Sequence, residues 1–408
     1  MHSLPPPILH NYKKIIDVCI TLIIGIALYK LCYQLFYYQS IQYTGVLGNY
    51  QSDLPTHIQF GLNGGNYSCL YWIIGIIVRN LGNSSIAVLE SIFVVITWYF
   101  TAKLVTKISG FNSIISIYVA VGLIFLSNIC IPTYNFYYTA GYKSTFTLTT
   151  QPWHNITYIG MRLFAVITIY YFVDLYKNYQ KEVLWTNYLF VTSFLFLSVC
   201  IKPNFLISYA LALLISLIID FAKDSKKMDN IWKYIILGST VFPSCVILFI
   251  QSRILYPSGI TGGDTGTSGI TLRWFATELF SSGLVLGTVN IILGLAFPML
   301  VLILNRGRDK LFKFIWIFFV ATFIVINIFT ETGPRAFHMN FYWGVFCASY
   351  LLFLFSIAYF MKNWKENFPK ARNISLLYKF VGVFLFIAHT LSGLFYFDLL
   401  LKGSTYLI

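Results

Sequence analysis

The sequence predicts an all-α protein, a polytopic transmembrane helical bundle of about 11 spans, and three observations lead to this fold class. The chain of 408 residues is 58% hydrophobic and only 10% charged, whereas soluble domains are about 45–50% apolar and about 25% charged. Apolar runs of about 20 residues, the length that a membrane-crossing helix needs, recur along the whole chain. The positive charges fall in short clusters between these runs, as they do in the cytoplasmic loops of membrane proteins.

The predicted spans follow one another as apolar stretches separated by charged or turn-forming segments. They cover 15–38, 85–106, 113–134, 157–175, 185–201, 206–222, 234–256, 283–304, 314–330, 341–361 and 380–401. We interpret the first as a retained anchor, because it is too long for a signal peptide. The apolar run 67–81 is short for a crossing, so we expect it to form an interfacial or re-entrant helix in the first outer loop. If it crossed instead, every later loop would change sides.

The positions of lysine and arginine orient this bundle. A cytoplasmic N-terminus puts most of the 28 basic residues on the inner side, including the four lysines of 223–233, and it makes the C-terminus external. The chain 1–408 then forms a single membrane domain with external segments 39–84, 135–156, 257–282 and 331–340. The net charge of +14 is explained by these inner loops, so we expect the lipid bilayer and no nucleic acid as a partner. The seven cysteines are scattered singly without metal-ligand spacing, and we expect no metal site.

The stretch QSDLPTHIQF at 51–60 places an acidic residue and a histidine just after the first span. Pro55 suits the first turn of a helix, and Ser52 or Asp53 suits its N-cap. Asp53 would then cap an interfacial helix. It could equally face a polar cavity as a general base or cation partner, with His57 one helical turn away. The two interpretations are compatible.

The second outer segment contains a dense group of polar and aromatic residues. Gln151, Trp153, His154 and Asn155 occur within five positions, and such side chains recognise sugars through ring faces and hydrogen bonds. The alternative for Trp153 is an aromatic belt at the headgroup level.

Two basic residues at the outer side are candidate phosphate ligands. Arg162 lies inside a predicted span, where an arginine is costly unless it is paired or solvated. It could snorkel to the surface or bind a phosphate or carboxylate through its guanidinium fork. Lys202 lies in the turn of CIKPNF, where it is either a loop residue without a functional role or a second phosphate contact.

The last two outer segments supply further candidates. The glycine-rich segment 257–282 resembles a flexible lid. In FTETGPRAFHMNFYWG, Glu331, Arg335, His338 and Asn340 lie close together, and this mixture of acid, base and cation is typical of an active site. A simple ion pair between Glu331 and Arg335 that stabilises the turn is the alternative.

With SDLPTH in the first outer loop, a short helix after it and about ten further spans, the chain resembles the GT-C class of integral-membrane glycosyltransferases. It is also similar to the bacterial repeat-unit polymerases of capsule and O-antigen synthesis, although it lacks their one very large external loop. The resemblance implies a bacterial cytoplasmic membrane protein with a polyprenyl-phosphate-linked sugar as substrate, working with other polysaccharide-assembly proteins. Its essential acidic residue would map onto Asp53.

Both resemblances imply one reaction, in which an acceptor hydroxyl attacks an anomeric carbon and expels a polyprenyl phosphate or diphosphate. Asp53, with His57 and Glu331 as further catalytic candidates, would act on the hydroxyl. Basic residues, Arg162, Lys202 and Arg335, would neutralise the leaving group. His338, Trp153, His154 and Asn155 are the remaining candidates for substrate binding. A transporter or a flippase for lipid-linked oligosaccharides is the alternative function, since charged residues in spans also occur there.

Overall fold

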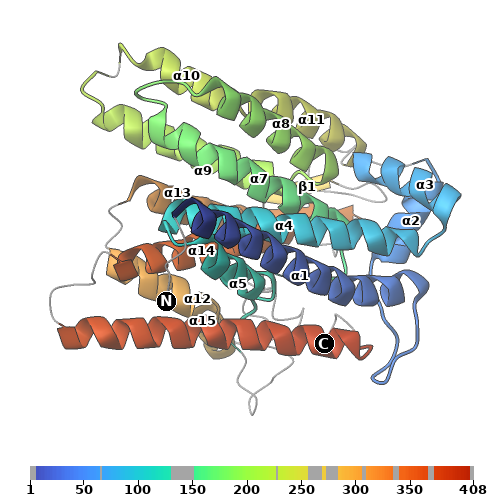
Figure 1. Ribbon diagram of the computed structural model, residues 1–408. Helices are drawn as coiled ribbons and strands as arrows, with labels where there is room; N and C mark the ends of the chain where they lie inside the picture. Colours follow the sequence, from blue (N-terminus) through green and yellow to red (C-terminus); the bar gives the residue numbers. More distant parts are fainter. Residues whose placement is uncertain are drawn as a thin grey trace, which may run out of the picture.

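The computed structural model describes residues 6–64, 67–129, 151–226, 228–255, 269–272, 284–305, 309–333, 340–365 and 372–404. Helices make up nearly all of it, which confirms the all-α prediction (Figure 1). The helices are α1 (Pro6–Ile41), α2 (Leu54–Leu62), α3 (Cys69–Leu81), α4 (Ser85–Ser109), α5 (Ser113–Ile124), α7 (Ile156–Asn178), α8 (Trp185–Ile201), α9 (Asn204–Lys223), α10 (Ile231–Ser239), α11 (Phe242–Leu255), α12 (Leu284–Asn305), α13 (Lys310–Ile328), η3 (Asn340–Tyr342), α14 (Trp343–Lys365) and α15 (Arg372–Leu401).

Within the described ranges, 8 helical segments are long and apolar enough to cross a membrane, so this is a helical membrane protein. They correspond to α1, α4, α7, α9, α10 with α11, α13, α14 and α15. The three other predicted spans coincide with the shorter apolar helices α5 and α8 and with Ile291–Asn305 of α12. Every predicted span thus contains a helix, while the number that cross stays a prediction.

The predicted span 113–134 is too long at its end, because α5 stops at Ile124 and the backbone continues in a non-helical form to residue 129. The chain there lies directly against α15. A Cβ added to Gly393 would stand 1.3 Å from the Phe125 carbonyl oxygen, so only glycine permits this approach. The Ser127 N–H donates to the His389 carbonyl at 3.3 Å, and His389 Nδ1 donates to the Ser127 carbonyl at 2.7 Å. These contacts replace the helical hydrogen bonds that the segment gives up.

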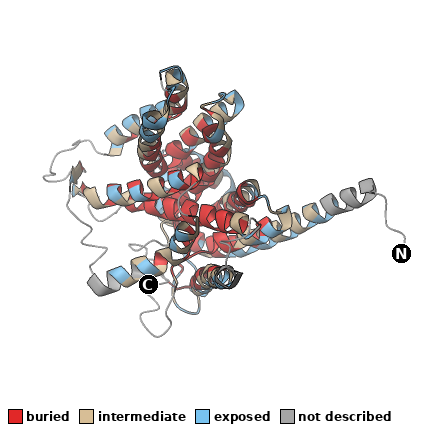
Figure 2. Ribbon diagram, turned by 90° about the vertical axis from the view of Figure 1, so that its left-hand side faces the viewer, coloured by how far each residue is buried: buried red, intermediate tan, exposed pale blue. Residues whose placement is uncertain are grey.

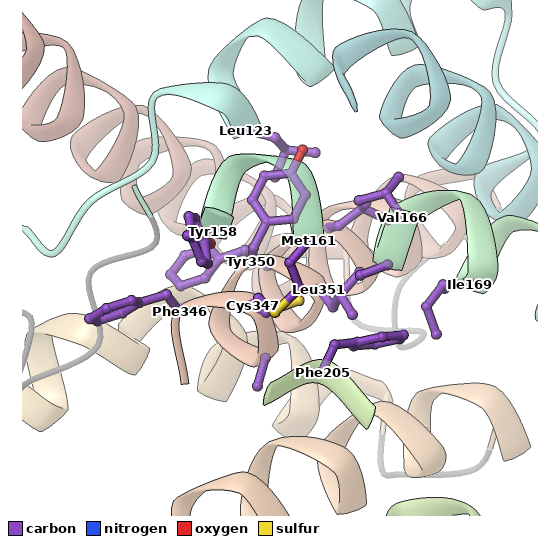
Figure 3. Packing of buried hydrophobic residues seen from close by; sticks show 14 of the residues in the cluster. Leu123, Tyr158, Met161, Val166, Ile169, Phe205, Phe346, Cys347, Tyr350 and Leu351 are labelled. Atoms are coloured by element: carbon purple, nitrogen blue, oxygen red, sulfur yellow. The ribbon is translucent and has the colours of Figure 1, made fainter. Parts of the chain in front are cut away.

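The core of the bundle is built around α14 and α7. In an 18-residue apolar stretch of each helix, 100% of the residues are buried in α14 and 83% in α7, but only 11% in α1. Figure 2 shows the buried residues concentrated in the central helices. A helix that is apolar on all sides belongs in such a position. In Figure 3, Tyr158 of α7 packs beside Phe346 and Tyr350 of α14, and Phe205 approaches from α9.

A hairpin of α2 and α3 lies at one end of the bundle (Figure 1). Its helices touch at Gly61 and Gly75, since a Cβ on Gly75 would stand 2.3 Å from the Gly61 carbonyl oxygen. Ser68 caps α3 by accepting from the Leu70 N–H at 3.3 Å. The short helices expected in the first outer loop are therefore present, and their place at the membrane interface stays a prediction.

Two short strands, which the sequence did not predict, join two of the outer segments. Strands β1 (Gly269–Leu272) and β2 (Phe329–Thr332) pair antiparallel, with Gly269 opposite Thr332 and Leu272 opposite Phe329. The described residues 269–272 of the segment 257–282 are thereby hydrogen-bonded to residues 329–332. Of the outer segment 135–156, the described part begins at residue 151.

Candidate functional site

Asp53 stands at the start of α2, but its side chain does not cap that helix. The backbone at Asp53 is helical (φ −74, ψ −8), and no side-chain capping hydrogen bond forms. The Ser52 hydroxyl instead accepts from the Leu54 N–H at 3.0 Å. The expectation that Asp53 caps α2 is wrong, because a capping residue needs an extended backbone to turn its oxygen toward the following amides. The carboxylate is thereby left for other partners.

Asn155 is the residue that holds this carboxylate. It caps α7 from an extended backbone, and its Oδ1 accepts from the Tyr158 N–H at 2.9 Å and from the Thr157 hydroxyl at 2.7 Å. Since Oδ1 faces these donors, the amide nitrogen must face Asp53 and His57. Nδ2 donates to Asp53 Oδ2 at 2.9 Å and lies 3.3 Å from His57 Nε2. One amide group thus orients two of the three predicted catalytic side chains, Asp53 and His57.

The contacts of His57 define its tautomer. The Asn155 amide nitrogen can only donate, so His57 Nε2 is the acceptor and Nδ1 carries the proton. Nδ1 then donates to the Tyr71 hydroxyl at 3.1 Å, and the two rings stack at 5.5 Å. Burial lowers the pKa of His57 to about 4, with Lys202 and His154 adding to this effect and Asp53 opposing it. The imidazole is therefore neutral at pH 7.

His154 approaches the same carboxylate from the segment before α7. Its Nε2 lies 3.8 Å from Asp53 Oδ2, and burial lowers its pKa to about 4. Burial also raises the pKa of Asp53, but His154, His57, the Asn155 amide and the Lys202 ammonium together bring that pKa below its ordinary value. Where both imidazoles are neutral, the Asn155 amide and the Lys202 ammonium still favour the ionised form of Asp53. The Asp53 side chain is 35% exposed, so a substrate can reach it.

Lys202 connects this polar group to the apolar interior of the bundle. It follows the last residue of α8, is buried, and lies 4.0 Å above the ring of Trp343. Its Nζ donates to Thr157 Oγ1 at 3.2 Å, and Thr157 in turn donates to Asn155. A continuous chain of hydrogen bonds therefore runs from Lys202 through Thr157 and Asn155 to Asp53.

Lys202 also lines a cavity of about 350 Å³ beside α9 and α11. Most of the wall is apolar, with Ile207, Leu248 and Phe249 among its side chains. Gln251 adds a polar side chain to this wall. Its Nε2 donates to the Val199 carbonyl at 2.8 Å, whereas its buried Oε1 has no hydrogen-bond partner among the described residues. The cavity thus combines a cation and a hydrogen-bond acceptor with apolar walls.

Glu331 shapes the far wall of this cavity. Its Oε2 accepts from the backbone N–H of Asn340 at 3.1 Å and from Asn340 Nδ2 at 2.7 Å. The Asn340 carbonyl accepts from Asn204, and both asparagines line the cavity. Glu331 therefore acts on the cavity through Asn340. Arg335 and His338, and the suggested pair of Arg335 with Glu331, lie outside the described residues.

Arg162 and Trp153 lie deeper in the protein. Arg162 is buried and donates to Gln151, so the idea that it snorkels to the surface is wrong. Its guanidinium carbon lies 5.2 Å from the ring centre of Tyr350 and 5.6 Å from that of Tyr158. Nε and Nη2 have no hydrogen-bond partner in the described part of the chain.

The ring of Trp153 is buried and packs 4.9 Å from Phe397 and 5.8 Å from Phe125. The aromatic-belt interpretation is wrong for it, since a belt residue would be exposed to headgroups. Its ring faces are filled by protein neighbours.

The structure brings together Asp53, His57, His154, Asn155 and Lys202, which come from three segments far apart in the sequence. Sequence reasoning missed the polar residues that connect or extend this group, namely Tyr71, Thr157, Asn204 and Gln251. Each is a single polar residue within an apolar or turn-forming stretch, and its sequence context carries no signal. Among the described residues, no group of three or more His, Cys, Asp or Glu side chains is placed to hold a metal ion.

No protein-family model, curated protein or solved structure matches this chain.

Proposed function

We propose that this protein is a membrane glycosyltransferase or polysaccharide polymerase that uses a polyprenyl-phosphate-linked saccharide at an external site. Its product would belong to a capsule, an exopolysaccharide or an O-antigen. One observation carries the proposal: an accessible carboxylate is tied by hydrogen bonds to a lysine at the edge of an apolar cavity. A lipid-linked sugar phosphate needs these three features side by side.

Asp53 would act at the reacting carbon. The acceptor hydroxyl places its oxygen against the anomeric carbon and passes its proton toward Asp53 as the new C–O bond forms. The lowered pKa of Asp53 makes it a weak base but a permanent negative charge. That charge stabilises the positive charge which develops on the sugar ring in the transition state. Asn155, whose amide nitrogen also contacts neutral His57, holds the carboxylate in place for this task.

Lys202 would act on the leaving group. When the bond between the anomeric carbon and the phosphate oxygen breaks, the electron pair stays on the phosphate, and a nearby ammonium group neutralises it. The apolar walls at Leu248 and Phe249 would receive the first isoprene units, and Gln251 Oε1 could accept a hydrogen bond from a sugar hydroxyl. Burial of Lys202 strengthens its effect on the phosphate, because water does not screen it.

The central test is the substitution Asp53→Asn. In a deletion strain that carries this variant, we expect surface polymer to fall by at least about 100-fold, the lower range for loss of a positioned acid or base. Lipid-linked saccharide should accumulate at the same time. Asp398→Asn is the matched control. Asp398 lies at the same end of the bundle, is 48% exposed and pairs with Lys402, so its loss should leave polymer formation unchanged.

The same variants in proteoliposomes distinguish the enzyme from a flippase. Purified wild-type protein supplied with lipid-linked saccharide should form a new glycosidic bond and release polyprenyl phosphate or diphosphate. Movement of the donor across the bilayer without any new bond would contradict the proposal, as would wild-type polymer levels in well-inserted Asp53→Asn protein.

A further inference from the structure

A second cavity, of about 530 Å³, lies at the opposite end of the bundle from Asp53, where α9 ends and α13 begins. Its polar lining comes from Ser216, Asp220, Lys223, Lys310 and Lys313. None of these residues takes part in the candidate site described above. The basic residues outnumber the acidic one, which gives the lining a net charge of about +2 at neutral pH.

The single carboxylate of this cavity is already occupied. Asp220 Oδ2 pairs with Lys310 Nζ at 2.8 Å and accepts from the hydroxyls of Tyr179 at 2.8 Å and Tyr176 at 3.3 Å. The Lys310 ammonium also lies 4.4 Å from the ring centre of Tyr176 and 4.5 Å from that of Tyr179. These contacts fix Lys310 and consume the only negative charge in the lining.

The other two lysines have no such partner among the residues that the structure describes. Lys223 and Lys313 are exposed and form no ion pair with any described residue. The nearest further acid on α13, Asp309, caps that helix through the N–H groups of Leu311 at 2.9 Å and Phe312 at 3.3 Å. It also accepts from Tyr359 of α14 and does not line the cavity. Asp224, which follows Lys223, accepts from Asn230 Nδ2 at 2.9 Å and from the Tyr234 hydroxyl at 3.0 Å and does not line the cavity. Within the described structure, neither Lys223 nor Lys313 is therefore paired with a carboxylate.

Most of the remaining wall is apolar, and exposed apolar side chains lie beside it. Leu302, Phe314 and Ile317 line it, and Ile219 at its edge is 37% exposed. Ile303, which follows Leu302 in α12, is 62% exposed. A free inorganic anion would gain nothing from such walls, whereas a ligand with a hydrocarbon tail would bury them.

We propose that this cavity binds an anionic phospholipid, with the phosphate held by Lys223 and Lys313 and one acyl chain lying along Leu302 and Ile317. Basic pockets between transmembrane helices are suited to anionic headgroups, because the ammonium groups stand at headgroup depth. The site is separate from the proposed transferase site, and its test does not depend on enzyme activity.

The test measures lipid binding to the detergent-purified full chain by native mass spectrometry, with phosphatidylglycerol as the probe. We expect wild-type protein to retain phosphatidylglycerol in preference to phosphatidylcholine. Lys223→Gln/Lys313→Gln should weaken phosphatidylglycerol binding by at least five-fold. Lys103→Gln/Lys181→Gln is the control, since it removes the same charge from exposed positions at the same end of the bundle, outside the cavity. It should leave binding unchanged.

Three outcomes would overturn the proposal. Equal retention of phosphatidylglycerol by wild type and by Lys223→Gln/Lys313→Gln would show that the cavity lysines do not hold the headgroup. Displacement of the lipid by millimolar inorganic phosphate would show a site for a free anion. If diacylglycerol bound as tightly as phosphatidylglycerol, the headgroup charge would be irrelevant to binding. The assignment of an anionic lipid would then be wrong.

Discussion

Asn155 controls the chemistry of the candidate site although it need not touch a substrate. Its side chain caps α7, orients Asp53 and determines which nitrogen of His57 carries the proton. The sequence placed Asp53 and His57 among the candidates because charged residues are rare in so apolar a chain, and Asn155 because it belongs to a dense polar and aromatic group. It could not reveal that Asn155 joins the other two, since that depends on packing between segments about a hundred positions apart.

The buried histidines make the stability of the folded protein depend on pH. Burial lowers the pKa values of His57 and His154 from 6.5 to about 4. Between these pH values the unfolded chain binds protons that the folded chain does not, so stability falls as the pH drops from 6.5 toward 4. Each histidine contributes roughly 1 kcal/mol per pH unit. Asp53 adds nothing in this window, because its folded-state pKa is lowered and its contribution is lost only at lower pH.

We therefore expect the thermal unfolding midpoint of the wild-type protein in detergent to decrease between pH 6.5 and pH 4.5. His57→Gln/His154→Gln removes both titrating groups, and its midpoint should decrease less over the same range. A double variant that loses as much as wild type would show that other groups control the acid sensitivity.

Among the elements, the α2–α3 hairpin determines where His57 and Tyr71 stand, because each helix carries one of them. The length of the apolar run at 67–81 was enough to predict a short helix there. The β1–β2 pairing could not be predicted, since two four-residue strands far apart in the sequence leave no recognisable pattern. The early end of α5 also escaped prediction, because it depends on the absence of a side chain at Gly393 in a different helix.

The close crossing of this hairpin predicts a strong effect of Gly75→Ala. The added Cβ would stand 2.3 Å from the Gly61 carbonyl oxygen, so the helices must separate and the His57–Tyr71 contact must lengthen. Overpacking of this kind costs about 1–3 kcal/mol. We expect a lower unfolding midpoint and reduced polymer formation. Gly25→Ala is the matched control in α1, because its Cβ would make only ordinary van der Waals contacts, with the Trp98 ring at 3.5 Å and Val95 Cγ1 at 3.8 Å. An equal effect of both substitutions would contradict this explanation.

At the scale of the whole molecule, the two ends of the bundle carry different charges. One end holds the α2–α3 hairpin, the β1–β2 pair and the Asp53 site. The other end collects lysines from the ends of several helices, including Lys107, Lys177, Lys223, Lys233, Lys310 and Lys362. Because basic residues are retained on the cytoplasmic side, this asymmetry supports the proposed orientation, in which the Asp53 site faces outside. The sequence alone was enough to predict this orientation, since the charge rule needs only the order of spans and loops.

Cysteine labelling tests this orientation, on which the proposed donor depends, because nucleotide sugars are confined to the cytoplasm. Thr56 in α2 and Lys226 after α9 are both exposed and lie at opposite ends of the bundle. The exposed Cys19, Cys69 and Cys245 would first be replaced by serine. We expect Thr56→Cys to react with a membrane-impermeant maleimide in intact cells, and Lys226→Cys to react only after permeabilisation. The reverse pattern would place Asp53 and Lys202 in the cytoplasm, where a nucleotide-linked donor could reach them, and the lipid-linked donor would lose its main support.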